Sequence, residues 1–275
     1  MVSGLKTISP FRVLKRWNYA LRYIYPQFQL VIKWGFKQTE MHNYYYPLNR
    51  LNRDYLVNFI SKIANVDSLI IEKYFSELEN DLELRTEILE VWKNDEKMVD
   101  SIPAYGRRVA WYALVRVLKP ARVLETGVHQ GIGSKVICKA LRLNSIEGFD
   151  GRYFGTDIDL NAGSLMSNLD KTVGTILYGD SINSINGLND SIDLFISDSD
   201  HSLDYEMREY QAVKSKMQSS GIYISDNAHI SSKLLEFANA EGLAFDYLNE
   251  VPKEHWYPGG GLGIAYSRED RSSNR

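Results

Sequence analysis

The strongest constraint on the fold is the alternation of short apolar strands with helices after Pro120. The pattern predicts five strands separated by helices, and then two more strands with no helix between them. Alternation of this kind favours a mostly parallel sheet with right-handed crossovers, and the final pair favours an antiparallel hairpin. The predicted strands are 122–126, 153–157, 175–178, 192–198, 221–226, 244–248 and 261–267, and the predicted helices are 133–143, 160–169, 202–217 and 231–241. We therefore expect an α/β fold with a doubly wound, mostly parallel seven-stranded sheet whose final strand is antiparallel.

The first hundred residues have the pattern of helices. Apolar residues recur at helical spacing in 51–63 and 69–78, Asp67 is a plausible N-cap, and Asp81 could start a helix that runs to about Trp92. A further helix is expected over 104–118, ending before Pro120. We therefore divide the chain into a helical N-terminal arm and lid region, 1–100, and a larger domain, 101–275.

Composition indicates a globular protein in a reducing compartment. Hydrophobic residues make up 44% and charged residues 24% of the chain, and no run approaches the ~18 apolar residues of a membrane span. No secretory signal pattern is visible, and Cys138 is the only cysteine, so no intramolecular disulfide can form. We expect a cytoplasmic protein. Its net charge of −3 gives no overall attraction to nucleic acid, and no nucleic-acid partner is expected.

Residues 1–39 form a basic, aromatic arm with seven Lys and Arg side chains, eight aromatic residues and no acidic residue. One interpretation is that the aromatic side chains pack on the main domain or on a second subunit of a homo-oligomer. The other is peripheral contact with an anionic membrane or a polyanion. We expect the first.

A glycine-rich turn follows the first predicted strand. Its glycines are spaced G-x-x-x-G-x-G from Gly127 to Gly133, with Glu125 two residues earlier. Glycine lets a backbone turn sharply and approach a ligand, and the helix that follows offers unpaired N–H groups. The nicotinamide fingerprint G-x-G-x-x-G has a different spacing, so the turn favours another cofactor.

The sequence Glu125-Thr126-Gly127-Val128-His129-Gln130-Gly131 resembles the first motif of class I S-adenosylmethionine-dependent methyltransferases, E-x-G-x-x-x-G. The resemblance covers about 105–267 and implies a Rossmann-like domain that binds S-adenosylmethionine. The residues it implies at the cofactor are Glu125, Gly127, Gly131, Ser134, Asp157, Asp180 and Asp198. Asp157 would accept the ribose hydroxyls, and Asp180 would lie near the adenine amino group. Alternatively, Asp180 is a turn residue, and Asp159 is better explained as a helix cap than as a ligand.

Polar side chains also follow the fourth and fifth predicted strands. Asp198, Asp226 and Asn227 could converge, because the tips of neighbouring parallel strands lie about 5 Å apart. Three oxygen ligands without a thiolate favour Mg²⁺. The set resembles catechol- and caffeoyl-CoA-type O-methyltransferases, whereas the D-x-x-H motif from Asp198 to His201 resembles macrocin-type and cephalosporin-hydroxylase-like proteins, in whose sugar branch this His is the general base. Alternatively, Asp198 caps a helix and His201 is hydrogen-bonded in a loop; for Asp200 we expect a cap.

These features lead to one expected function and two alternatives. We expect metal-assisted methyl transfer to a hydroxyl of a small-molecule acceptor of sugar or natural-product type, with His201 and Asp198 as catalytic residues. Tyr105, Arg107 and Arg108 would border the pocket, and the loop 253–261 would act as a lid. The alternatives are a metal-independent methyltransferase and a cofactor-binding interaction protein that docks through the arm.

Overall fold

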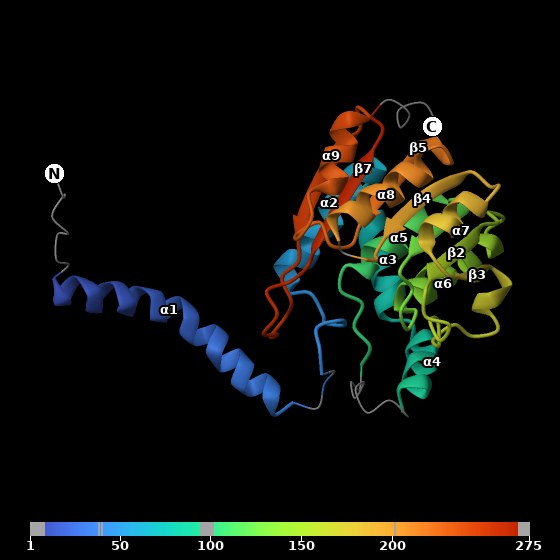
Figure 1. Cartoon of the computed structure of the whole chain (residues 1–275). Helices are drawn as coiled ribbons and strands as arrows, with labels where there is room; N and C mark the ends of the chain where they lie inside the picture. The colour runs from blue at the N-terminus through green and yellow to red at the C-terminus, as the bar shows by residue number, and fades with distance from the viewer. Residues whose placement is uncertain (1–8, 38, 40, 94–101, 201, 269–275) are drawn as a thin grey trace, which may run out of the picture.

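A seven-stranded sheet organises the molecule, in the strand order β3-β2-β1-β4-β5-β7-β6 (Figure 1). The computed structural model describes residues 9–37, 39, 41–93, 102–200 and 202–268. Strands β1 to β5 are parallel, and β7 pairs antiparallel with both β5 and β6. The Rossmann-like fold and the antiparallel ending are therefore as predicted. The strands are β1 (Arg122–Thr126), β2 (Arg152–Asp157), β3 (Gly174–Tyr178), β4 (Ile192–Ser197), β5 (Met217–Ser225), β6 (Ala244–Asn249) and β7 (Gly261–Tyr266).

Helices cover both faces of the sheet. One face carries α2 (Arg50–Ala64), α3 (Ser68–Glu79), α4 (Leu82–Trp92), α5 (Arg108–Leu118) and α6 (Ile132–Ile146); the other carries α7 (Ser181–Gly187), α8 (Leu203–Lys214) and α9 (Lys233–Ala240). Side chains of α2, α3 and α4 belong to the same hydrophobic cluster as Val123 of β1 and Ile222 of β5. The helices before residue 100 therefore share a core with the sheet.

Helix ends follow the capping signals of the sequence. The side chains of Asn49, Asp67 and Asp81 each accept a hydrogen bond from a backbone N–H in the first turn of α2, α3 and α4. Helix α5 ends at Leu118 with Lys119 in the left-handed conformation, just before Pro120. It begins at Arg108 and not at 104, because Gly106 has a φ of +52°, which does not belong to a helix.

Two segments between strands differ from the predictions. The helix expected over 160–169 is a series of turns followed by a short 3₁₀ helix, η1 (Asp170–Thr172). Gly163, with a φ of +78°, interrupts the helical path, and the Asp159 side chain accepts the N–H of Asn161 in a tight turn. Asp159 therefore caps a turn and not a helix, which differs from the prediction. Helix α7 was not predicted, because its seven residues are mostly polar and form no apolar stripe.

Helix α1 (Pro10–Gly35) projects away from the rest of the molecule (Figure 1). None of its residues is buried. Trp34, at its end, contacts the rings of His255 and Trp256, whereas the other seven aromatic residues of the arm keep more than half of their surface exposed. The expected packing of these aromatic residues on the main domain is therefore wrong except at Trp34. Among the described helices, none is long and apolar enough to cross a membrane.

Candidate active site

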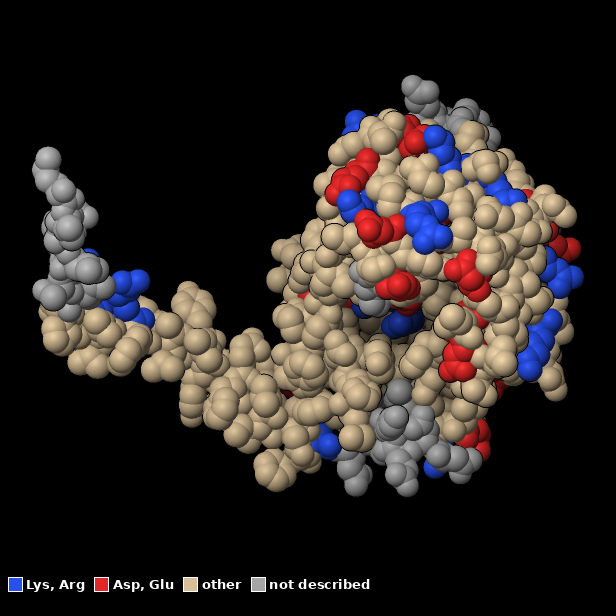
Figure 2. Space-filling view, viewed as in Figure 1, with Lys and Arg blue, Asp and Glu red and all other residues tan. Residues whose placement is uncertain are grey.

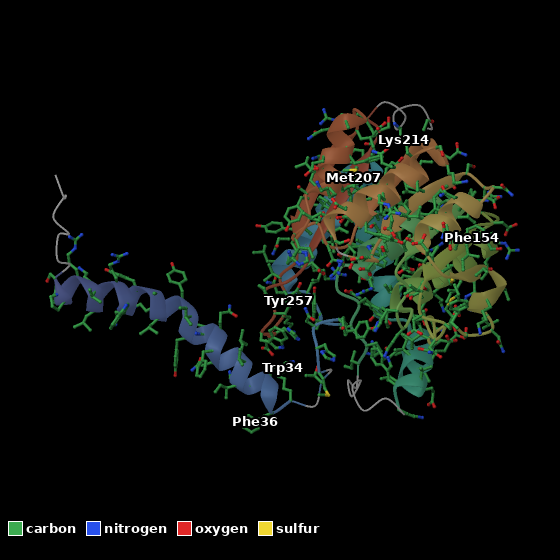
Figure 3. The ribbon with its side chains drawn as sticks, viewed as in Figure 1. Trp34, Phe36, Phe154, Met207, Lys214 and Tyr257 are labelled. Atoms are coloured by element: carbon green, nitrogen blue, oxygen red, sulfur yellow. The ribbon has the colours of Figure 1, made fainter. Side chains whose placement is uncertain are left out.

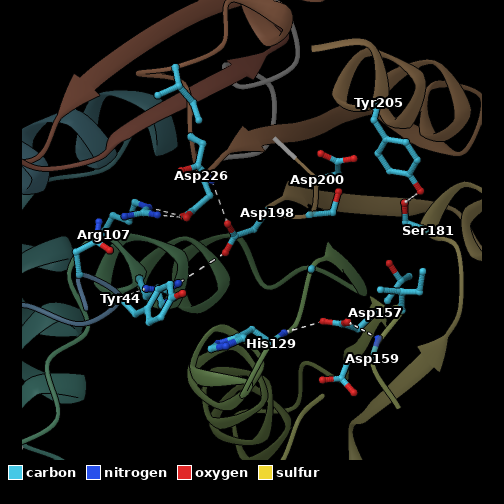
Figure 4. Close-up of a pocket in the computed structure, with 18 of the residues that line it drawn as sticks. Tyr44, Arg107, His129, Asp157, Asp159, Ser181, Asp198, Asp200, Tyr205 and Asp226 are labelled. Atoms are coloured by element: carbon cyan, nitrogen blue, oxygen red, sulfur yellow. Dashed lines mark hydrogen bonds and ion pairs between the residues drawn. The ribbon is translucent and has the colours of Figure 1, made fainter. Parts of the chain in front are cut away.

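A cavity of about 830 Å³ opens at the carboxyl ends of the parallel strands. The strand order reverses between β1 and β4, and diverging connections at such a switch point leave a ligand crevice. The loops after β1 to β5 line the cavity together with the segment 43–45 and the loop that carries Tyr257 (Figure 4). Figure 2 shows this face hollowed, with basic atoms at the bottom of the hollow and acidic side chains around it.

The glycine turn after β1 lies against the tip of β4. The N–H of Asp198 donates to the carbonyl of Thr126 at 2.9 Å, which brings the two loops together. Gly127 has a φ of +82°, and a Cβ at this position would lie 2.1 Å from the carbonyl oxygen of Asp198. Only glycine fits here, as the motif implies.

Glu125 and Ser134 lie beneath the turn and do not face the cavity. The Ser134 hydroxyl is within 2.6 Å of the Tyr153 hydroxyl and donates to Glu125 at 3.2 Å, and Tyr153 donates to Glu125 at 2.5 Å. All three side chains are buried. Burial raises the pKa of Glu125 to about 7. The predicted hydroxyl contact of Ser134 with the cofactor is therefore corrected to a structural role, and neither Glu125 nor Gly131 lines the cavity.

Asp157 holds the glycine turn in place. One carboxylate oxygen accepts the backbone N–H groups of Val128 and His129 at 2.9 and 2.8 Å, and the other accepts the N–H of Asp159 at 2.8 Å (Figure 4). The side chain also lines the cavity. A carboxylate has about four acceptor sites, so this set leaves room for a donor from a ligand, as the predicted contact with ribose hydroxyls requires.

Asp180 combines the two roles that the sequence left open. It caps α7 by accepting the N–H of Asn183 at 2.8 Å, and it lines the cavity beside Ser181 and Tyr205. The Tyr205 hydroxyl donates to its other oxygen at 2.8 Å. These bonds from Asn183 and Tyr205 lower the pKa of Asp180, so it presents an ionised acceptor to the cavity.

A buried carboxylate that the sequence did not predict connects the ends of two strands with the start of a helix. Glu209 of α8 accepts hydroxyl hydrogen bonds from Thr126, Ser181, Ser197 and Ser199 at 2.5–3.0 Å. We call these five residues the Glu209 cluster. It links the ends of β1 and β4 to the start of α7. The signal was present as isolated hydroxyls after three strands, but nothing in the spacing pairs them with a helical glutamate.

Asp198, Asp226 and Asn227 meet, as predicted, at the tips of β4 and β5. The Asn227 amide donates to Asp198 at 3.2 Å, and Arg108 lies 3.6 Å from the other oxygen of Asp198. Asp226 is fully buried, and the guanidinium of Arg107 donates to both of its carboxylate oxygens. Arg107 also contacts Glu250 at 2.7 Å.

The pKa values of Asp198 and Asp226 are shifted in opposite directions. Burial and the neighbouring charge of Asp226 raise the pKa of Asp198 well above its ordinary value. Burial also raises the pKa of Asp226, but the contact with Arg107 outweighs burial, and the net direction is down. Of the pair, Asp226 therefore has the lower affinity for a proton and Asp198 the higher.

These residues do not fit the magnesium site that the sequence predicts. Both oxygens of Asp226 are bound by Arg107, and the Asn227 amide presents its nitrogen, not its oxygen, to Asp198. Two guanidinium groups already supply positive charge where the cation would bind. No group of three or more His, Cys, Asp and Glu in the described parts of the chain is arranged to hold a metal ion.

Of the remaining predicted residues, Asp200 and Tyr257 line the cavity. His201 lies outside the described residues. Asp200 accepts the N–H of Ser202 in a tight turn just before α8, and no side chain caps that helix, so the expected helix cap at Asp200 is wrong. Tyr257 and His229 both line the cavity, and the Tyr257 hydroxyl lies 3.2 Å from Nε2 of His229.

Comparisons with known proteins agree with this fold. Residues 124–228 match a family model described as a methyltransferase domain. Among solved structures, the chain is similar to the O-methyltransferase TomG from Streptomyces achromogenes in complex with SAM, at 15% identity and a TM-score of 0.53 over 70% of this chain and 94% of that one. It is also similar to an O-methyltransferase from Bacillus cereus in complex with SAH, at 15% identity and a TM-score of 0.53 over 71% and 96% of the two chains. No match is found among the curated proteins.

The fold and the cavity at the switch point of the sheet define a Rossmann-like domain of the methyltransferase type. More particularly, residues 124–228, which span β1 to the tip of β5, form a methyltransferase domain.

Proposed function

We propose that the protein transfers a methyl group from S-adenosylmethionine to a hydroxyl oxygen of a small molecule, without a metal ion. The observation that carries the proposal is the continuity of one cavity from Asp157 and Asp180 to Asp198 and Asn227. Its volume, about 830 Å³, is in the range of small-ligand pockets and must hold both cofactor and acceptor. The acceptor is therefore small.

The cofactor would be held on the β1–β3 side of the cavity. Asp157 would accept the ribose hydroxyls, and Asp180, kept ionised by its own donors, would accept the adenine amino group. S-adenosylmethionine supplies an electrophilic methyl group on a sulfonium sulfur. The protein's contribution is to hold the acceptor oxygen in line with that group, and positioning of this kind supplies much of the barrier reduction in two-reactant sites.

Asp198 is the group we assign to the acceptor proton. It lines the cavity beside Gly127, and it is oriented by Asn227 and Arg108. Its pKa is raised by burial and by the charge of Asp226, which makes it the better proton acceptor of the two aspartates. The oxygen–methyl bond forms as the sulfur–methyl bond breaks, and the hydroxyl proton passes to Asp198. The predicted role of His201 as base remains a second candidate for the same step.

The test is an activity assay on a panel of hydroxylated small molecules, followed by detection of S-adenosylhomocysteine and of the methylated product. We expect O-methylated products at the same rate with and without excess EDTA. Asp198→Asn should lower turnover by roughly 10²–10⁴, the usual share of a general base, and leave S-adenosylhomocysteine binding unchanged. Loss of activity in EDTA with recovery on added Mg²⁺ would refute the metal-free site. A large loss in His201→Ala with none in Asp198→Asn would assign the base to His201.

A further inference from the structure

Helix α1 has an apolar face that the described part of the chain leaves uncovered. Its residues recur every three or four positions from Leu14 to Ile32. Figure 3 shows most side chains of α1 standing clear of the rest of the molecule. Each of its members exposes between 49 and 62% of its surface. The apolar face of α1 consists of Leu14, Trp17, Leu21, Ile24, Phe28, Val31 and Ile32.

The rest of the helix is basic. At about 100° per residue, all five Lys and Arg side chains of α1 lie on the side opposite Phe28. They are Arg12, Lys15, Arg16, Arg22 and Lys33. No carboxylate occurs before Glu40, and residues 1–39 carry seven positive charges in a chain of net charge −3, so the remainder carries −10. Positive charge is therefore concentrated on α1.

We propose that α1 lies flat on an anionic lipid surface, with its apolar face in the headgroup region and its basic side chains toward the lipid phosphates. Three features point to this partner: a long amphipathic helix, exposed Trp and Phe on one face, and Lys and Arg without acids on the other. Five charges make a transmembrane position unfavourable, in agreement with the absence of a membrane-spanning helix among the described residues.

A second copy of the chain is the competing occupant. Two α1 helices packed through their apolar faces would bring together ten positive charges without one carboxylate along the helices. Pro26 also interrupts the backbone hydrogen bonds in the middle of the helix. The negative charge of an anionic bilayer attracts the positive charges of α1, whereas a second α1 helix would repel them.

The helix is connected to the active-site rim through aromatic rings. Trp34 packs on Trp256 at 5.7 Å between ring centroids, and Trp256 packs on Tyr257 at 6.0 Å. Tyr257 lines the cavity, and Figure 3 shows it on the same side of the molecule as Trp34. A lipid-bound α1 would therefore hold the loop at the mouth of the cavity close to the membrane.

The test uses the full chain and two matched variants. Leu21→Glu places a charge on the apolar face, and Tyr23→Glu places the same charge on the basic side, 86% exposed. Neither position is buried, so both variants should fold. Binding is measured by sedimentation with vesicles of phosphatidylcholine alone and of phosphatidylcholine mixed with phosphatidylglycerol.

We expect the protein to bind the anionic vesicles and not the neutral ones, and to dissociate as salt rises. Tyr23→Glu should lower the partition coefficient about fivefold, the contribution of one charge near such a surface. Leu21→Glu should lower it at least about tenfold further, because an apolar contact is lost as well. Equal effects of the two variants would mean that only charge matters and would overturn the proposal. So would a dimer in light scattering that Leu21→Glu dissociates, combined with no vesicle binding.

Discussion

The guanidinium of Arg107 binds both carboxylate oxygens of Asp226, and both side chains are buried. Glu250 accepts from the same guanidinium at 2.7 Å and from Tyr46 at 2.8 Å. One arginine thus joins α5, the tip of β5 and the segments around 46 and 250. It places a fixed positive charge at the wall of the cavity where the sequence suggested a metal ion.

Loss of Arg107 should destabilise the fold strongly. Arg107→Ala leaves Asp226 and Glu250 as buried, unpaired carboxylates, and breaking a buried ion pair costs about 3–5 kcal/mol. Arg107→Lys is the matched control. It keeps the charge but cannot bind two oxygens at once, so an intermediate loss is expected. Chemical denaturation measures both, and an unchanged free energy of unfolding in Arg107→Ala would contradict the assignment.

Asp157 should contribute directly to cofactor affinity. Asp157→Ala removes the acceptor of the Val128 and His129 N–H groups, which is also the acceptor proposed for the ribose, so S-adenosylhomocysteine should bind about 1–3 kcal/mol more weakly in calorimetry. Asp159→Ala, at a neighbouring cavity residue whose carboxylate caps a turn, is the control. An equal loss in both variants would mean that the local loop, and not the ribose contact, sets the affinity.

The close approach at Gly127 should make it intolerant of any side chain. Gly127→Ala would force a Cβ to within 2.1 Å of the Asp198 carbonyl and push the β1 and β4 loops apart. Gly179→Ala is the matched control. Gly179 also has a positive φ and lines the cavity, but a Cβ added there would have no atom within 4 Å. We expect binding of S-adenosylhomocysteine to be lost in the first variant and weakened in the second. Comparable binding by the two would contradict the steric explanation.

Burial of Glu125 should make stability depend on pH. Its pKa is about 7 in the folded protein and near 4.5 when exposed, so between these values the folded state keeps a proton that the unfolded chain has released. The contribution of Glu125 to stability therefore falls as pH rises through this window. From pH ~5 to pH ~8, the free energy of unfolding of the native protein should fall by about 2–3 kcal/mol relative to Glu125→Gln. Parallel curves for the two proteins would exclude the raised pKa.

The sequence predicts the sheet well because its strands are short, apolar and separated by strong turn signals. It predicts the convergence of Asp198, Asp226 and Asn227 for a related reason, since tips of adjacent parallel strands must lie together. It could not predict that Arg107 takes Asp226, because that pairing joins residues 119 positions apart across the helix–sheet interface.

Two predictions of local structure were wrong, because neither apolar spacing nor a motif fixes the path of the backbone. The stretch after Asp159 has enough apolar residues for a helix, but Gly163 and the Asp159 turn set its path. Ser134 follows the glycine turn in sequence, yet the start of α6 rotates its hydroxyl toward Glu125 and Tyr153. The direction in which a side chain points in the first turn of a helix depends on the residue at which the helix begins, and a motif does not fix that residue to within one position.

The cavity has two separately supported walls. The Glu209 cluster joins β1, β4 and α7 on the cofactor side, whereas Arg107 joins α5, β5 and the segments around 46 and 250 on the acceptor side. The two supports share no residue. A substitution at a cavity-lining position outside both networks, such as Tyr257, can therefore reshape the acceptor side and leave the cofactor wall in place, so the proposed activity can move to a new acceptor with the same methyl donor.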